Sequence, residues 1–177
     1  MEKEKILIIM NGPSCAGKST TAKLLLSKHK TFFKLSYDNV KRFYSDYKVE
    51  THFEKVYEIL NAMAKVATAQ GYNVFVDGCI TRKNREGLIQ IFKDARYKVY
   101  EFNIEASKDT LLERFEKRVK ERVEQNIPIT NTSVDRLLKL EKMYQDDKNI
   151  NAVTYNTDSI NAEDVVRSIE GYIGYNS

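Results

Sequence analysis

A run of eight residues near the start of the chain has the types and spacing that bind phosphate. It reads Gly12-Pro13-Ser14-Cys15-Ala16-Gly17-Lys18-Ser19 and fits the pattern G-x-x-x-x-G-K-S/T in full. Gly12 and Gly17 permit the backbone angles that turn main-chain N–H groups inward around a phosphate. Lys18 would reach the β- and γ-phosphates of a nucleotide, and the Ser19 hydroxyl would bind Mg²⁺. We therefore predict that this run and Thr20 form a nucleotide phosphate site.

The residues on either side of this run support the prediction. Residues 5–10 are a short, mainly apolar stretch, typical of a strand buried on both faces, and lead directly into the loop. Residues 17–29 have the pattern of a helix, whose first N–H groups and partial positive charge would face the phosphate. The alternative to a phosphate site is a glycine-containing turn with a surface lysine. The order strand, loop, helix argues against that alternative.

Two aspartates follow predicted strands and would reach the same crevice. Asp77 comes after the strand at 72–76 and would hold Mg²⁺ directly or through water, although Asp-Gly is also a common turn. Asp38 comes just after the strand at 32–36. Ligands of open α/β sheets bind outside the carboxyl ends of the strands, so Asp38 would face the same ligand. We predict that it is a general base that takes a proton from an acceptor hydroxyl, a role compatible with capping the next helix.

Arginines recur every four residues along one predicted helix, at positions 114, 118 and 122, and therefore share one face. An apolar stripe that could pack on the domain runs beside them, made of Leu111, Phe115, Val119 and Val123. We predict that residues 107–132 form a lid, and that at least one of the three arginines contacts a transferring phosphoryl group. A solvated helix of mixed charge is the alternative. Arg82 and Arg85 follow the Asp77 turn and either hold an anionic substrate or are ordinary surface charges.

Short apolar runs alternate along the chain with longer amphipathic segments, and these elements would position the residues described above. This alternation is typical of a parallel α/β sheet. Strands are predicted at 5–10, 32–36, 72–76, 97–104 and 152–155. Helices are predicted at 17–29, 53–70, 82–95, 107–124 and 133–146, with a short one opening at Asp38 and a last one capped by Asn161.

The length and composition place limits on the class of protein. A chain of 177 residues favours one domain, residues 1–177. No apolar run reaches the roughly 20 residues that span a bilayer, so we expect a cytoplasmic protein with no membrane partner. The chain has two cysteines and two histidines without metal-type spacing, which argues against a zinc site. The net charge of +4 suits an anionic ligand but does not by itself indicate nucleic acid.

Several of these motifs together resemble a known group of enzymes, the AAA-type small P-loop kinases related to polynucleotide 5′-hydroxyl kinase, chloramphenicol phosphotransferase and zeta-toxin-like proteins. The resemblance covers most of the chain and rests on residues 12–19, 36–39, 76–78 and 112–118. It implies a three-layer P-loop NTPase fold, with a five-stranded parallel sheet, helices on both faces and a helical lid. It also implies ATP and Mg²⁺ as cofactors, Asp38 as the general base, Arg118 at the donor phosphates and Arg114 as a nearby basic residue of the lid.

The chain departs from this group at one position of the acceptor site. The group has an arginine shortly after the general base, which grips a phosphate of the acceptor. Here that position is most simply Lys41, with Arg42 next to it. A lysine offers a point charge where an arginine offers two parallel hydrogen bonds, so the resemblance leaves the acceptor open.

These observations favour an ATP-dependent phosphotransferase that moves the γ-phosphoryl group onto a hydroxyl. One acceptor is the 5′-hydroxyl of a nucleic acid, whose backbone would meet basic residues that include Lys41, Arg42, Lys48, Arg82 and Arg85. The alternative acceptor is a small alcohol such as an antibiotic, sugar, nucleoside or nucleotide-sugar. The aromatic residues Phe43, Tyr44, Tyr47 and Phe53 could stack a base or line an apolar pocket. A non-catalytic nucleotide-binding regulatory module is a second alternative, against which Asp38 and the lid arginines argue.

Overall fold

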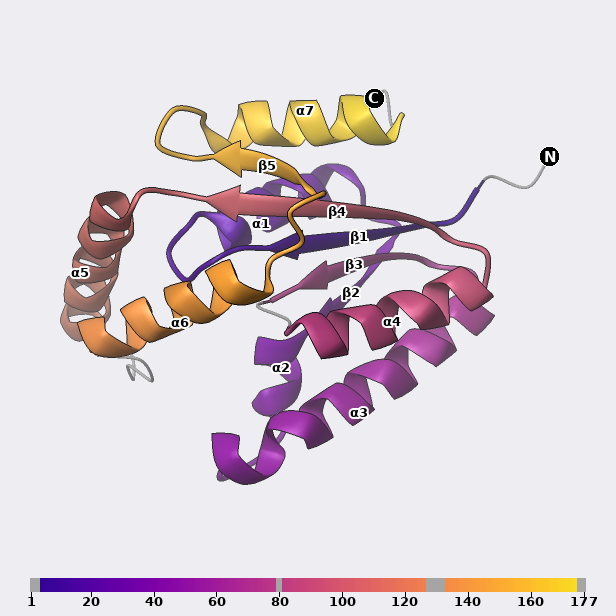
Figure 1. Ribbon diagram of the computed structural model, residues 1–177, viewed down its shortest axis with the longest axis horizontal. Coiled ribbons are helices and arrows are strands. Elements are labelled where there is room, and N and C mark those ends of the chain that lie inside the picture. Colours follow the sequence, from indigo (N-terminus) through magenta and orange to yellow (C-terminus); the bar gives the residue numbers. More distant parts are fainter. Residues whose placement is uncertain (1–3, 79–80, 127–132, 175–177) are drawn as a thin grey trace.

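The chain folds around five parallel strands (Figure 1). The structure is a computed structural model that describes residues 4–78, 81–126 and 133–174. The strands are β1 (Ile6–Asn11), β2 (Phe32–Ser36), β3 (Asn73–Asp77), β4 (Lys98–Glu105) and β5 (Val153–Asn156). Their order in the sheet is β2-β3-β1-β4-β5, and every neighbouring pair is parallel. The predicted five-stranded parallel sheet is confirmed.

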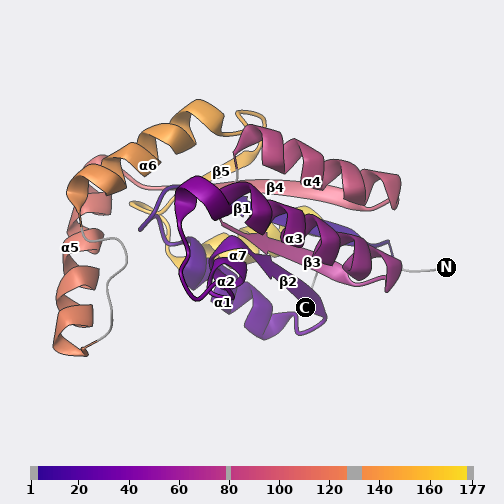
Figure 2. The same ribbon diagram turned by 90° about the horizontal axis from the view of Figure 1, so that it is seen from below.

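Helices cover both faces of the sheet. After each parallel strand, a crossover connection must carry the chain back to the end of the sheet at which the next strand begins, and such connections usually contain a helix. They are α1 (Lys18–Lys28), α2 (Tyr37–Lys41), α3 (Val49–Ala69), α4 (Arg82–Asp94), α5 (Lys108–Glu124), α6 (Val134–Asp147) and α7 (Ala162–Ile173). Figures 1 and 2 show α3 and α4 on one face, α1 and α7 on the other, and α5 and α6 near the carboxyl ends of the strands. Within the described ranges, no helix is both long enough and apolar enough to cross a membrane.

Strand β1 lies at the centre of the sheet, and all of its side chains are buried. Its side chains alternate between two hydrophobic cores, as the two-residue period of a strand requires. Ile6, Ile8 and Met10 pack in the core with α1 and α7, whereas Leu7 and Ile9 pack in the core with α3 and α4. The end of β1, where the phosphate loop begins, is therefore held from both faces.

Side chains cap several helices, and one exception matters for the site. Ser107 accepts a hydrogen bond from the Thr110 N–H at 3.3 Å, and Asn161 accepts one from the Asp164 N–H at 2.9 Å, as the sequence predicts. Helix α1 instead begins after Gly17, which has no side chain to act as a cap. The first N–H groups of α1 therefore have no side-chain acceptor from the N-cap residue.

The apolar stripe predicted along α5 packs on the domain only in its first half. Leu111 and Phe115 are buried, but Val123 is 61% exposed. Figure 2 shows the reason, because α5 extends away from the sheet and its last turns stand apart from the other helices and strands. The predicted lid includes residues 127–132, which lie outside the described residues.

A buried carboxylate joins the two helices on the α1–α7 face. Glu170 of α7 is 6% exposed and accepts hydrogen bonds from His29 Nε2 at 2.8 Å and Lys28 Nζ at 3.2 Å. Burial by itself would raise the pKa of Glu170, but the hydrogen bonds and charges of His29 and Lys28 outweigh it and lower the pKa below 4.5. A carboxyl group with a lowered pKa stabilises the fold above about pH 4.5, and this contribution is lost as the pH falls below that value.

We predict that Glu170→Gln lowers the free energy of unfolding by about 1–3 kcal/mol near neutral pH, because the charged hydrogen bonds are lost. The difference from the unmutated protein should shrink below about pH 4.5. Urea unfolding at several pH values measures both effects. The exposed Glu54→Gln in α3 is the control and should change stability by less than about 0.5 kcal/mol. A difference that stays constant down to about pH 3 would contradict the assignment.

Candidate active site

The loop between β1 and α1 has a shape that only small or tolerant residues allow. Gly12, Cys15 and Gly17 have positive φ angles of 152°, 68° and 95°. A Cβ atom at Gly12 would lie 2.0 Å from the Ile104 carbonyl oxygen, so glycine is required there. Lys18 Nζ donates a hydrogen bond to the Pro13 carbonyl at 2.6 Å and so closes the loop on itself.

This loop and the start of α1 fit a polyphosphate. Gly17, Lys18, Ser19 and Thr20 line one side of a cleft of about 1010 Å³, together with Pro13, Ser14 and Cys15. The first turn of a helix has N–H groups without intrahelical partners and a partial positive charge, which bind anions. The ammonium group of Lys18 adds a full positive charge beside them. The predicted phosphate loop is therefore built as an anion site.

Residues from five other segments line the same cleft. They are Tyr37, Asp38 and Lys41 of α2, Asp77 and Gly78 at the end of β3, Arg114 and Arg118 of α5, Arg136, Leu140 and Met143 of α6, and residues 157–162 after β5. These segments meet because the carboxyl ends of parallel strands lie at one edge of the sheet. The cleft thus brings together the phosphate loop, both predicted aspartates and two lid arginines.

Asp77 and Ser19 are the residues that fit Mg²⁺. Asp77 has a side chain that is only 13% exposed, and its Oδ2 lies 2.9 Å from Lys34 Nζ of β2. A carboxylate and a hydroxyl oxygen in one cleft, beside an anion site, match the oxygen ligands that Mg²⁺ takes when it also binds phosphates. Lys34 neutralises the Asp77 carboxylate from the neighbouring strand, as the register of β2 and β3 allows.

Asp38 stands in the first turn of α2 with a side chain that is 65% exposed. Its carboxylate forms an ion pair with Lys41, one turn further along the helix. Because the side chain is this exposed, a hydroxyl group in the cleft can approach it. Lys41 also lines the cleft, but its ammonium group is already engaged by Asp38.

Arg114 connects the lid helix to the phosphate loop through Thr157. Its guanidinium donates to the Thr157 Oγ1 at 2.8 Å, to the Thr157 carbonyl at 2.9 Å and to the Cys15 carbonyl at 3.4 Å. The Thr157 hydroxyl lies 3.0 Å from the Ala16 carbonyl and 3.1 Å from the Glu105 carbonyl, and its single proton is available to one of them. Arg114 therefore positions the loop rather than pointing freely into the cleft.

Arg118 lies one turn further along α5 and reaches the other part of the loop. Its Nη2 donates to the Ser14 Oγ at 3.4 Å, and its guanidinium lies 5.9 Å from the centre of the Phe115 ring. This long hydrogen bond leaves most of the donors of Arg118 available at the phosphate loop. Arg122, in the last turn of α5, is not among the residues that line the cleft.

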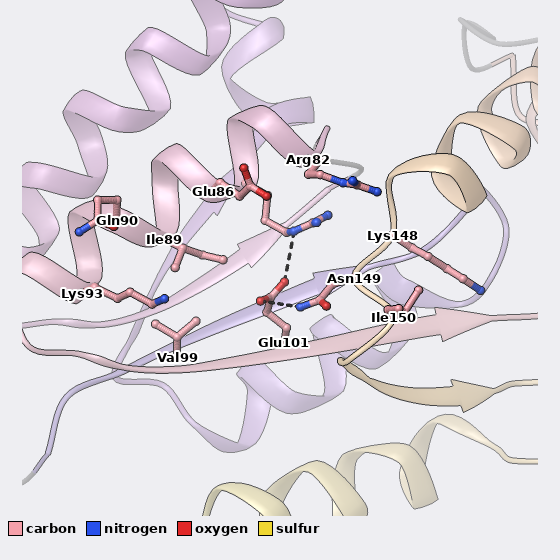
Figure 3. A pocket seen from close by; sticks show the side chains of 11 residues that line it. Arg82, Glu86, Ile89, Gln90, Lys93, Val99, Glu101, Lys148, Asn149 and Ile150 are labelled. Atoms are coloured by element: carbon pink, nitrogen blue, oxygen red, sulfur yellow. Dashed lines mark hydrogen bonds and ion pairs between the residues drawn. The ribbon is translucent and has the colours of Figure 1, made fainter.

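Three basic residues considered as substrate ligands lie outside the cleft. Arg42 follows α2 and is exposed to solvent away from the cleft. Arg82 and Arg85 line a second cavity of about 670 Å³ between α4, β4 and the end of α6 (Figure 3). Arg85 is 5% exposed, with its Nε 3.3 Å from Glu101 and its Nη1 2.9 Å from the Asp147 carbonyl. Arg82 donates to the Asp146 carbonyl at 3.2 Å, so both arginines join α4 to the end of α6.

Two features of the cleft escape the sequence reasoning. Arg136 of α6 and Thr157 after β5 both line it, yet neither belongs to a recognisable motif. Ser133 caps the helix that contains Arg136, so the helix itself can be predicted. Which side of that helix meets the cleft cannot be predicted. Thr157 carries no local signal, because its role depends on contacts with residues 43 to 141 positions away.

The sheet order, the phosphate loop and the arginine-bearing helix beside the cleft define a three-layer P-loop nucleotide-binding fold. The family model described as an AAA domain matches residues 7–146, well over half of the chain. The chain belongs to this AAA domain family, which confirms the resemblance to the group of small P-loop kinases. No curated protein sequence matches the chain.

Solved structures with this fold include kinases of several kinds. The Mycobacterium tuberculosis APS kinase CysC in complex with AMPPNP and APS has a TM-score of 0.70 at 16% identity, over 97% of this chain and 98% of that chain. A sugar kinase from Janibacter sp. HTCC2649 has a TM-score of 0.63 at 11% identity, over 98% and 96%. The Pnkp1/Rnl/Hen1 RNA repair complex contains a chain with a TM-score of 0.65 at 16% identity, over 82% and 45%. At these identities the likeness shows the fold alone.

We predict that Gly12→Ala lowers the free energy of unfolding by about 3 kcal/mol or more, because the new Cβ would overlap the Ile104 carbonyl. Gly171→Ala in α7 is the matched control, since a Cβ there would meet nothing within 4 Å. That control should raise stability by roughly 0.5–1 kcal/mol, as alanine is the better helix former. Urea unfolding compares the two variants. Equal effects would show that the close approach at Gly12 is unimportant.

Proposed function

We propose that the chain is an ATP-dependent phosphotransferase that moves the γ-phosphoryl group of ATP onto a hydroxyl acceptor. One observation carries the proposal: Asp38, a solvent-accessible carboxylate, lines the same cleft as the phosphate loop and the pair Ser19 and Asp77. A protein that only bound nucleotide would have no use for a carboxylate facing the acceptor side of the cleft. This arrangement supports catalysis over the alternative of a non-catalytic regulatory module.

The chain's own residues divide the work between donor and acceptor. The loop N–H groups and Lys18 would hold the β- and γ-phosphates, and Ser19 and Asp77 would hold a magnesium ion. When bound, this ion neutralises negative charge on the phosphates. Asp38 orients the acceptor hydroxyl and takes its proton as the new O–P bond forms and the bond to the β-phosphate oxygen breaks. Arg118, above the loop, stabilises the charge on the transferring group.

The first candidate acceptor is the 5′-hydroxyl of a nucleic acid, and the alternative is a small alcohol such as an antibiotic, a sugar, a nucleoside or a nucleotide-sugar. Among the basic residues expected to meet a nucleic-acid backbone, Lys41 alone lines the cleft, whereas Arg42, Arg82 and Arg85 do not. Few basic residues are therefore placed to contact the backbone of a polynucleotide beyond the nucleotide that carries the acceptor hydroxyl.

We expect Asp38→Ala to lower kcat by about 10²–10⁴-fold, because the acceptor loses its general base. The Kd of ATP with Mg²⁺ should change by less than about threefold, since the phosphate loop is intact. Transfer is measured with γ-labelled ATP against a panel of 5′-hydroxyl RNA, 5′-hydroxyl DNA, nucleosides and small alcohols, and binding by calorimetry.

The control is Asp46→Ala, which removes a nearby exposed carboxylate that is paired with Lys48 and lies outside the cleft. It should leave both transfer and binding unchanged. Full transfer activity in the Asp38 variant would remove Asp38 from the mechanism. Failure of the unmutated protein to bind ATP would overturn the proposed function as a whole.

A further inference from the structure

A lysine interrupts the apolar run of β2 on the side of the sheet that α1 covers. Phe32 of this strand packs against the core with α1 and α7, whereas Phe33 and Leu35 pack against the core with α3 and α4. Because strand side chains alternate, Lys34 lies on the same face as Phe32. Strand β2 is at the edge of the sheet, and the Lys34 side chain is 36% exposed. At an edge strand a lysine can keep its ammonium group near water while its stem lies along the sheet.

The register of β2 and β3 brings this lysine to the carboxylate at the end of β3. Lys34 lies opposite Phe75, and Asp77 is two residues further along β3, on the same face. A long side chain reaches such a diagonal neighbour. Lys34 Nζ lies 2.9 Å from Asp77 Oδ2. The ion pair is therefore fixed by the pairing of two strands.

The ion pair occupies one of the two carboxylate oxygens of Asp77. None of the residues that the structure describes hydrogen-bonds to the other oxygen, Oδ1, and the side chain as a whole is 13% exposed. Asp77 lines the cleft, but Lys34 does not, so the lysine reaches the carboxylate from outside the cleft. A carboxylate held in this way through one oxygen keeps the other available to a ligand in the cleft.

The electrostatics of the cleft do not favour a free divalent cation. Five of the lining residues are lysine or arginine, and three are aspartate. The Asp38 carboxylate is paired with Lys41. The Asp77 carboxylate is paired with Lys34. In the described parts of the chain, no three His, Cys, Asp or Glu side chains are grouped as metal ligands. A divalent cation without a nucleotide would therefore meet little net negative charge.

We propose that Lys34 is a counter-cation built into the magnesium site, which orients Asp77 and keeps it from retaining a divalent cation until nucleotide phosphates are present. Those phosphates supply the further negative charge and oxygen ligands that Mg²⁺ needs beside a single carboxylate. Lys34 is a positioning residue, because it acts through Asp77 and contacts neither the nucleotide nor the metal. The proposal rests on the proposed function, since it concerns the metal site of the same cleft.

The probe is Mn²⁺, which takes the same oxygen ligands as Mg²⁺ and whose free form is measured by electron paramagnetic resonance. Without nucleotide, Lys34→Met should bind Mn²⁺ at least about tenfold more tightly than the unmutated protein, because a full positive charge beside the carboxylate is gone. Lys34→Arg keeps the charge and should retain the weak binding. The control is Lys30→Met, an exposed lysine before β2 and outside the cleft, which should change nothing.

A double variant shows whether the gain in affinity acts through Asp77. Once Asp77→Asn has removed the carboxylate charge, adding Lys34→Met should change the Mn²⁺ affinity by less than about twofold. A purely structural ion pair predicts the opposite sign in the single variant, because loss of Lys34 would loosen Asp77 and weaken Mn²⁺ binding. Urea unfolding checks that each variant is folded, and Lys34→Gln takes the place of Lys34→Met if the latter does not fold.

Unchanged or weaker Mn²⁺ binding in the folded Lys34→Met variant overturns the role of Lys34. A gain that persists together with Asp77→Asn overturns it too, because the ion then binds elsewhere. Neither result affects the proposed phosphotransferase, which a separate titration with Mg²⁺ and a non-hydrolysable ATP analogue tests. Failure of the unmutated protein to bind that analogue instead contradicts the proposed function. The two failures are therefore distinguishable.

Discussion

The close approach of the Gly12 main chain to the Ile104 carbonyl is the constraint on which the site depends. At this point the chain leaves β1 beside β4, and the main chain of β4 lies so close to Gly12 that there is no room for a side chain at that residue. The chain must then turn through the positive φ angles of Cys15 and Gly17 before α1 can begin. This path gives the loop its inward-facing N–H groups and leaves the first turn of α1 without a side-chain cap. An anion site follows directly from this backbone path.

The other parts of the cleft reach this loop through the topology of the sheet. Because all five strands are parallel, the residues that follow them meet at one edge of the sheet. Asp77 ends β3, Asp38 follows β2, and Thr157 follows β5. Arg114 then joins the lid helix to the loop through Thr157. The lid helix is thereby fixed at its first half, while its last turns stand apart from the other helices and strands (Figure 2).

Much of this arrangement can be predicted from local patterns. The phosphate loop has a fixed spacing, the strands are short apolar runs, and Ser107 and Asn161 mark where two helices begin. Asp38 and Asp77 are predicted because residues just after parallel strands share an edge. The largest error in a helix boundary is at α3, which begins at Val49 rather than at residue 53. Its N-cap residue, Lys48, supplies no capping side chain, and the first turn is instead held by His52, which accepts a hydrogen bond from the Lys48 N–H at 3.1 Å and lies against Tyr44.

The contributions of α4 and α6 could not be predicted, because they depend on tertiary packing. Arg85 has the sequence context of a substrate ligand, yet it is buried against Glu101 and joins α4 to the end of α6. Arg136 has no motif, yet the anchoring of α6 by Tyr144 turns it toward the cleft. A helix pattern shows which residues share a face but does not show what that face meets.

The central claim is that main-chain N–H groups at residues 14–20 bind the phosphates of a nucleotide, and amide hydrogen exchange tests it most directly. On addition of ATP and Mg²⁺, exchange at these residues should slow by at least about tenfold, because bound amides open less often. Exchange at the end of α4, far from the cleft, should not change. Protection that appears elsewhere while residues 14–20 exchange at their original rate would contradict the account.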